Sequence, residues 1–376
     1  MIKEPKSVFV LGAGFTKAFL PTAPLLVDFY DISHIIKKYE HFRHAHYILE
    51  KEFATRQDGK INIEQLMTRL DSGMPYDLFH GAREELLLLL SDIKIAFKNR
   101  LSEARLDAPP NYELKKALGA FALYCLATRS FCVTFNYDDI LDEVLWQISQ
   151  ITRPSHSMAW NPNNGYGFFC RSAPQVVWGG WTGMAEPSSS LVLKLHGSVN
   201  WYIRLGYISP YSIDAIAHSE DWCSNTGISD ETIQQINIHL ESEPFIVPPV
   251  LMKSSLVEQP IIRLLWEIAY DSLRLAKEIT FIGYSLPITD IAATFLFRES
   301  IRPNTRIKVI NFAETEEEKA MILSSYRKVF DDLDNESLEI GGACKWCNEY
   351  VLSRVLRDER MKHIYESYCK RISSSS

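Results

Sequence analysis

The chain has 376 residues, of which 46% are hydrophobic and 23% charged, so it can bury a sizeable core without disulfide or metal staples. Its net charge of −7 argues against non-specific binding to nucleic acid, and we expect no direct sequence-specific nucleic-acid contact. No apolar run reaches the roughly 18 residues that span a bilayer, so we expect no membrane partner. Seven cysteines at scattered spacings, with no secretory signal in view, predict a protein of the reducing cytoplasm.

Short apolar runs alternate along the chain with helical patterns, which predicts an α/β fold with a doubly wound, mostly parallel sheet. Strands are expected at residues 8–11, 131–135, 279–282 and 306–312, with short ones near 176–178. The run 191–203 is expected to hold a strand that stops at His196-Gly197, and 245–253 a short strand and a rigid turn. Helices are expected at residues 112–126, 140–150, 230–240, 261–278 and 291–300. We expect one α/β unit over residues 1–315, with a helical insertion or lid over 31–116. A helical extension follows over residues 316–376, read as helix, acidic loop and helix.

The first strand ends in a glycine turn, in the sequence LGAGFTKAF. Gly12 permits a sharp turn and Gly14 permits close backbone approach to a phosphate, while Thr16 can cap the helix or bind that phosphate. A redox dinucleotide site has a third glycine, where this chain has Lys17, and an acidic residue after a second strand. A proline-containing loop replaces that strand here. The turn therefore predicts a nucleotide site but argues against hydride transfer.

Polar residues also follow the other expected strands, and ligands of such sheets bind at the carboxyl ends of the strands. Asn136 and Asp138 follow one strand, where they can hold a water or a ribose hydroxyl or can simply form a turn. His196 is followed by glycine, which suits acid–base work better than the structural role common for a lone histidine. Gly283, Ser285 and Asn311 follow the last two strands.

Together, the motifs Gly-Ala-Gly, Asn-x-Asp, His-Gly, Gly-x-Ser and Val-Ile-Asn occur in order, each at a strand end. This joint pattern resembles the sirtuin family. The stretches TFNYDDILDE, LKLHGSVNW, PPVLMK and IGYSLPITD are similar to the sirtuin-like domain of bacterial anti-phage defence proteins. The likeness covers most of residues 5–315. It implies a Rossmann-like fold that takes NAD⁺ as its substrate.

The resemblance also implies roles for individual residues. In the NAD⁺ site so implied, Asn136 and Asp138 lie beside the nicotinamide and its ribose, and His196 is the general base. Asp28 corresponds to an acidic residue near the nicotinamide. The implied pyrophosphate residues are Gly12, Ala13, Gly14 and Thr16, and the implied adenosine residues are Gly283, Ser285 and Asn311. Asp290 and Lys253 lie in segments typical of the defence subfamily, without an assigned role.

The chain departs from protein-deacylating sirtuins, whose zinc module carries two cysteine pairs. Only Cys344 and Cys347 have that spacing, and they lie after the last expected strand, so we expect no zinc module and no metal. Loss of the module favours water as the nucleophile. The expected activity is an NAD⁺ hydrolase (NADase) that releases nicotinamide and ADP-ribose, acting in abortive infection.

Three other interpretations stay open at this point. The chain can be a non-catalytic NAD or ADP-ribose binding module, or an NAD-dependent protein deacylase or ADP-ribosyltransferase. Aromatic stretches such as VVWGGWTGM can also form an assembly surface. Defence proteins of the kind it resembles work with a partner, such as a HerA-type hexameric ATPase, or through self-assembly. We therefore expect a homo-oligomer or a partner subunit to control the activity.

Overall fold

The structure is a computed structural model that describes residues 5, 7–24, 29–30, 33–54, 61–72, 82–107, 111–152, 158–162, 164–168, 188–204, 215–216, 242–247, 259–287, 290–330 and 333–374. Asp28, Lys253, the expected strand at 176–178 and the expected helix at 230–240 lie outside these residues. Within the described part of the chain, no helix is both long and apolar enough to cross a membrane.

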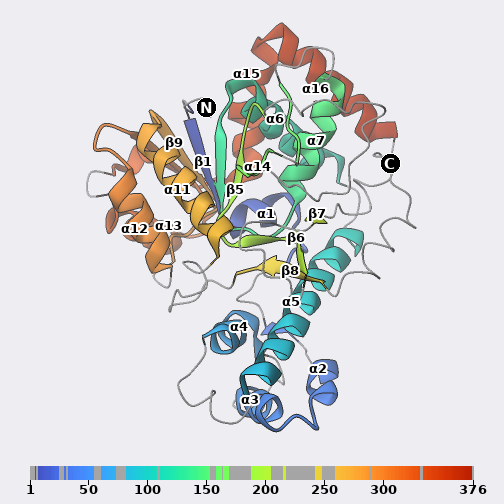
Figure 1. Cartoon of the computed structure of the whole chain (residues 1–376). Helices are drawn as coiled ribbons and strands as arrows, with labels where there is room; N and C mark the ends of the chain where they lie inside the picture. Colours follow the sequence, from blue (N-terminus) through green and yellow to red (C-terminus); the bar gives the residue numbers. More distant parts are fainter. Residues whose placement is uncertain are drawn as a thin grey trace.

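A six-stranded sheet forms the centre of the molecule (Figure 1). Its strands lie in the order β11 (Leu338–Glu339), β10 (Arg306–Ile310), β9 (Glu278–Ile282), β1 (Ser7–Leu11), β4 (Phe131–Thr134) and β5 (Val192–Lys194). Every neighbouring pair is parallel. The chain builds outward from β1 to β5, then returns to β9 beside β1 and builds outward in the other direction. The predicted doubly wound, mostly parallel sheet is therefore confirmed.

Helices cover both faces of the sheet, as the alternation of side chains along a strand requires. Phe9 and Phe281 occupy adjacent positions of the pairing between β1 and β9, offset by one residue, so they point to opposite faces. Phe9 packs on α6 (Tyr112–Thr128) and α14 (Gly342–Trp346). Phe281 packs on α12 (Ile291–Ser300) and α13 (Glu316–Arg327). This arrangement buries β1, β4 and β9 almost completely.

The remaining helices of this unit follow local sequence signals. Helix α11 (Pro260–Leu275) begins with proline at its first position, where the missing N–H costs nothing. Helix α13 begins with a capping box between Thr315 and Glu318. Helix α1 (Ala13–Phe19) follows β1, and α7 (Ile140–Thr152) follows β4.

The residues after 315 form more than a helical tail. They add β11 to the sheet, and α15 (Leu352–Arg357) and α16 (Glu359–Ser374) pack on α6 and α7. A short 3₁₀ turn (Asn335–Ser337) precedes β11, and a π-helical turn (Cys347–Val351) joins α14 to α15. The division of the chain at residue 316 stays a prediction.

A helical lobe of α2 (Ser33–Lys38), α3 (Arg43–Ala54), α4 (Ile63–Asp71) and α5 (Ala82–Asp107) projects from the sheet unit (Figure 1). A short antiparallel pair, β2 (Phe29–Tyr30) and β3 (Ile61–Asn62), precedes and interrupts these helices. The lobe has its own core, which also includes Tyr137, Val199 and Ile246 from the sheet unit. The lobe is therefore anchored close to the end of β4.

The run 191–203 breaks at His196-Gly197, as predicted: β5 ends at Lys194, and the chain turns at Leu195 and His196. The residues after the turn form a second strand in a different sheet, which was not predicted. Gly197 adopts a φ of +79°, and a Cβ there would lie 2.1 Å from the carbonyl oxygen of Phe245. β6 (Gly197–Arg204) then pairs antiparallel with β7 (Ala215–Ile216) and β8 (Ser242–Ile246). The sequence signal for this turn is the His196-Gly197 pair at the end of the apolar run.

Candidate active site

The carboxyl ends of β1 and β9 meet in a contact between two glycine turns. The Gly12 N–H donates to the Ile282 carbonyl at 3.1 Å, and the Gly14 N–H donates to the Gly283 carbonyl at 2.8 Å. Gly283 adopts a φ of +60°, and a Cβ there would lie 2.1 Å from the Phe15 nitrogen. A Cβ on Gly14 would lie 2.9 Å from the Gly283 Cα. Glycine is thus required here by chain packing alone.

This contact lies at the point where the strand order reverses, which is where ligands bind in doubly wound sheets. The chain after β1 runs into α1, which packs on α6 and α14, whereas the chain after β9 runs into α12 on the other face. Ala13 and Gly14 are exposed at the start of α1, while Gly12 is buried. The two turns therefore diverge from their shared contact at Gly12, Gly14 and Gly283, which we call the floor of the site.

Asn136, Thr16 and Asp138 form a hydrogen-bonded chain beside this floor. The Asn136 Nδ2 donates to the Gly12 carbonyl at 2.8 Å and to the Thr16 Oγ1 at 2.9 Å. The Thr16 hydroxyl in turn donates to the Asp138 Oδ2 at 2.5 Å. Both amide hydrogens of Asn136 are thus in use, which fixes the orientation of the amide. The sequence placed these residues at strand ends, but it did not predict that they bond to one another.

The Asn136 carbonyl oxygen, Oδ1, receives no hydrogen bond from the described residues. Asn136 is only half-buried, so this oxygen can accept a hydrogen bond from a ligand or a water. Asp138 is also half-buried, and its Oδ1 accepts from the Ile140 N–H at the start of α7 at 3.3 Å. Two acceptor groups therefore face the floor from the β4 end.

His196 is buried among aromatic rings at the end of β5. Its ring lies 5.3 Å from that of Phe135, 6.1 Å from that of Tyr137 and 6.4 Å from that of Trp266, measured between centroids. Phe135 and Tyr137 flank Asn136 in the chain, so the loop after β4 links Asn136 to His196. Only 3% of the His196 surface is exposed. His196 therefore packs, through aromatic rings, on the loop that carries Asn136.

Ser285 and Asn311 lie together on the other side of the floor. They line a groove of ≈ 490 Å³, whose charged lining residues are Glu314 and Glu318. The Asn311 Nδ2 donates to the Tyr284 carbonyl at 3.2 Å, which ties the ends of β9 and β10 together. Next to them, Phe312 is 63% exposed. The groove thus presents an aromatic face and several oxygen acceptors.

A buried ion pair behind the β4 end was missed by the sequence reasoning. Lys194 and Asp142 are each 1% exposed at the side chain and lie 3.0 Å apart. The Lys194 ammonium also donates to the Asp138 carbonyl, so it holds the loop that carries Asn136 and Asp138. Burial raises the pKa of Asp142 to about 6, against the opposing effect of Lys194. The one available signal was a lysine inside the apolar run LVLKL.

The polar chain continues away from the ion pair. The Tyr166 hydroxyl donates to Asp142 at 2.8 Å and accepts from Asn200 at 3.3 Å. The Ser198 hydroxyl lies 2.6 Å from the Asn200 Oδ1 and 3.1 Å from the Tyr137 carbonyl, and these two bonds complete the chain. Both sides of the loop after β4 are therefore held by buried polar contacts, which makes the loop rigid.

The helical lobe reaches the same loop. The Arg105 guanidinium, near the end of α5, forms ion pairs with Asp139 and Glu143 at the start of α7. Phe97 lies about two turns before Arg105 on α5, and its ring packs edge to face on that of Tyr137, with 5.8 Å between the ring centroids. The lobe is thus connected to the residues next to Asn136 by both charge and packing.

The cysteines among the described residues do not gather into a metal site. Cys344 is half-buried and accepts from the Asn348 amide at 3.6 Å, and Cys347 is buried in the π-helical turn. Burial raises the pKa of both thiols. Among the residues that the structure describes, no group of three or more His, Cys, Asp or Glu side chains could hold a metal ion. Cys170 and Cys223 lie outside the described residues.

Comparisons with known proteins leave the family open. No protein-family model and no curated protein matches the chain. Among solved structures, it is similar to a crystal structure of Sir2 in complex with the inhibitor EX-527, 2′-O-acetyl-ADP-ribose and a deacetylated p53 peptide. The two share 13% sequence identity and a TM-score of 0.34, and the match covers 94% of each chain. The fold assignment rests on the strand order and register described above.

Proposed function

We propose that this protein is an NAD⁺ hydrolase that cleaves the bond between nicotinamide and ribose, releasing nicotinamide and ADP-ribose. The observation that carries the proposal is the fixed amide of Asn136. Its two N–H groups donate to the Gly12 carbonyl and to Thr16, so its oxygen is left to accept a hydrogen bond from a ligand or a water. A site of this kind can orient a water, and it needs no metal to do so.

The reaction requires little covalent chemistry from the protein. The bond from the ribose C1′ to the nicotinamide nitrogen breaks, and the electron pair leaves with nicotinamide as a neutral molecule. Water then forms the new bond to C1′ and gives up a proton. In this proposal Asn136 Oδ1 orients the water, His196 accepts the proton, and Asp138 stabilises the positive charge that develops on the ribose.

The other half of NAD⁺ is assigned by position. The exposed backbone of Ala13 and Gly14 lies next to the floor and is proposed to face the pyrophosphate. The groove lined by Ser285 and Asn311 suits the adenosine. Its carboxylates can accept hydrogen bonds from the ribose hydroxyls, and the ring of Phe312 can stack on the adenine. The Thr16 hydroxyl and the Gly14 N–H are already bonded within the protein, so their role is to shape the turn.

The biological role proposed is NAD⁺ depletion in bacterial anti-phage defence by abortive infection, under the control of self-assembly or of a partner subunit. Support comes from the sequence stretches that resemble defence proteins, TFNYDDILDE and LKLHGSVNW among them. An activity that empties the NAD⁺ pool must be held silent in a healthy cell, and control by assembly would provide this.

Incubation of the purified chain with NAD⁺, followed by chromatography of the products, tests the activity. Nicotinamide and ADP-ribose should appear in equal amounts, and Asn136→Ala and His196→Asn should each lower the rate at least about a hundredfold. Asn304→Ala is the matched control, because Asn304 is exposed in the turn before β10, at the end of that strand that lies away from the candidate site. Its rate should equal that of the unchanged protein.

Three results would overturn the proposal. NAD⁺ that binds but is never consumed would identify a binding module. Consumption that needs an acetyl-lysine peptide or a protein acceptor would identify a deacylase or an ADP-ribosyltransferase. Hydrolysis that survives both Asn136→Ala and His196→Asn, in variants whose thermal unfolding is unchanged, would show that the catalytic residues lie elsewhere.

A further inference from the structure

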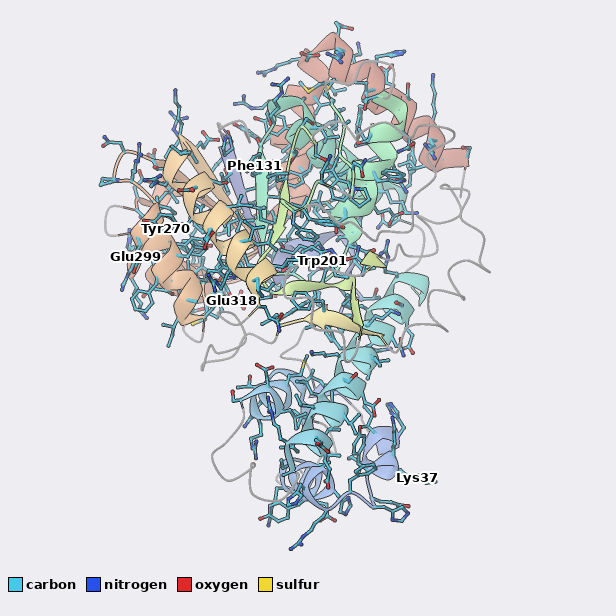
Figure 2. All side chains as sticks on the ribbon, viewed as in Figure 1. Lys37, Phe131, Trp201, Tyr270, Glu299 and Glu318 are labelled. Carbon is cyan, nitrogen blue, oxygen red and sulfur yellow. The ribbon has the colours of Figure 1, made fainter. Side chains whose placement is uncertain are left out.

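A large open groove lies between α11 and α12, away from the floor of the candidate site. It has a volume of ≈ 910 Å³, and its apolar lining includes Ile291 and Phe295, which are 45% and 53% exposed. Tyr270 and Trp266 line it from α11. All of its charged lining residues are acidic: Glu267, Asp271 and Glu299. Figure 2 shows Tyr270 and Glu299 close together at this surface.

The helical lobe carries a surface of opposite character. Arg43, Tyr47 and Lys51 on α3 are spaced four residues apart, so they form one stripe along the helix. All three are exposed, and Tyr47 has 60% of its surface free. The Lys51 ammonium lies 5.4 Å from the centre of the Tyr47 ring. We call these three residues the α3 stripe. It places an aromatic ring between two cations.

The charges around the two surfaces leave this contrast intact. Near the α3 stripe, the carboxylate of Glu50 lies 3.2 Å from the His46 Nε2, so it has a contact within the lobe. In the groove, Asp271 pairs with Arg274 at 3.1 Å, but both are exposed, and such a pair exchanges partners at little cost. Glu267 and Glu299 make no ion pair with the described residues.

We propose that the α3 stripe of one copy of this chain docks into the α11–α12 groove of a second copy. A helix laid in a groove between two helices is a common mode of recognition. Tyr47 would fill the apolar centre of the groove. Arg43 and Lys51, roughly 12 Å apart along the helix, would meet the acidic rims. Opposite charge and a matching aromatic anchor thus select this occupant from the surfaces that the structure describes.

The contact joins two different surfaces, so it is head-to-tail. Helix α3 lies at the far end of the lobe in Figure 1, well separated from α11 and α12. The α3 stripe therefore cannot reach the groove of its own chain, and each copy keeps one free surface of each kind. Such contacts generate rings or open filaments rather than two-fold dimers.

The groove is also close to the candidate catalytic histidine, and this part of the inference rests on the proposed function. Trp266 lines the groove, and its ring lies 6.4 Å from that of His196. Its indole N–H donates to the Leu195 carbonyl at 3.0 Å, at the turn that carries His196. A docked helix would press on the same side chain that packs against His196, so assembly can bear directly on activity.

Sedimentation velocity of the full chain over a concentration series tests the contact, and it needs no NAD⁺. The unchanged protein should grow beyond a dimer as concentration rises, and less so at high salt. Glu267→Lys with Glu299→Lys, or Arg43→Glu with Lys51→Glu, should each weaken association at least about tenfold. Tyr47→Ser should do the same without a charge change. Glu349→Lys with Glu366→Lys, at exposed positions outside both surfaces, is the control for the groove variant.

Mixing gives the sharpest test. The groove variant keeps its α3 stripe and Tyr47→Ser keeps its groove, so these two together should form a one-to-one pair that grows no further. A variant with all four charge reversals should associate again through exchanged charges. A chain that stays monomeric at every concentration, or a pair of variants that associates as fully as the unchanged protein, would overturn the contact. An unchanged protein that assembles in this way but does not hydrolyse NAD⁺ would count against the proposed function alone.

Discussion

Replacing Lys194 by methionine should destabilise the protein and uncouple the loop that carries Asn136. Methionine keeps most of the length and apolar stem of the side chain but removes the charge. It leaves Asp142 buried without its counterion, and it deletes the hydrogen bond to the Asp138 carbonyl.

The expected cost follows from the burial of both groups. Breaking one partner of a buried ion pair costs about 3–5 kcal/mol. The pKa of Asp142, raised from 3.8 to about 6 by burial even with Lys194 present, should rise further in Lys194→Met. Because that folded pKa exceeds the unfolded one, the folded state binds more protons between the two values. The contribution of Asp142 to stability therefore falls as pH rises through about 4–6.

The measurement is the free energy of unfolding from urea titrations between pH 4.5 and 8, together with the rate of NAD⁺ loss. Lys194→Met should lose about 3–5 kcal/mol at pH 7 and much less near pH 4.5, where Asp142 is already protonated. Lys194→Met combined with Asp142→Asn should regain most of the stability, because no charge is left unpaired. Its rate should stay low, since the bond to the Asp138 carbonyl is still missing.

Two outcomes would refute this reasoning. One is a Lys194→Met protein whose unfolding free energy at pH 7 lies within about 1 kcal/mol of the unchanged protein. The other is a double variant as unstable as the single one, which would mean that packing, and not charge, sets the cost. Lys277→Met, at an exposed lysine in the turn before β9, controls for the loss of a lysine as such.

Three further predictions address the floor of the site and the lobe. Gly283→Ala should lower the free energy of unfolding in urea by about 3–5 kcal/mol, because its Cβ would lie only 2.1 Å from the Phe15 nitrogen. Gly342→Ala is the control: its φ is also positive, at +79°, but its Cβ would lie 3.5 Å from the Phe312 ring, so it should cost only about 1–2 kcal/mol. Thr16→Val should slow NAD⁺ hydrolysis by at least about tenfold while Thr16→Ser keeps the rate, because only the hydroxyl bridges to the neighbouring amide and carboxylate. Arg105→Met should speed hydrogen exchange at the end of α5 and the start of α7, and unchanged exchange there would show that the ion pairs do not hold the lobe.

Elements with a strong local signal were predictable from the sequence. Helix α12 runs over Ile291–Ser300 as predicted, because Asp290 caps it and its apolar residues recur at helical spacing. The parallel strands were found as short buried runs. Strand β11, Leu338–Glu339, was missed, because it has two residues and only its pairing with β10 makes it a strand. Pairing of this kind depends on residues distant in sequence.

The site was predictable in its order along the chain but not in its bonds. Strand ends converge in any parallel sheet, so Gly12, Asn136 and Gly283 had to lie near one another. Which side chains then bond depends on loop geometry that no local pattern encodes. The ion pair of Lys194 was not predictable for a related reason. A lysine in a buried strand has no evident role until its partner on α7, Asp142, is known.

The acidic run DDILDE shows how the fold assigns different roles to similar side chains. Of its four carboxylates, Asp139 and Glu143 pair with Arg105 from the lobe, and Asp142 pairs with Lys194 from the sheet. Only Asp138 has no cationic partner among the described residues. Its carboxylate accepts from a hydroxyl and a backbone N–H, and it is half-buried at the strand ends. A ribose that becomes positively charged as nicotinamide leaves is the ligand that such a carboxylate would stabilise most.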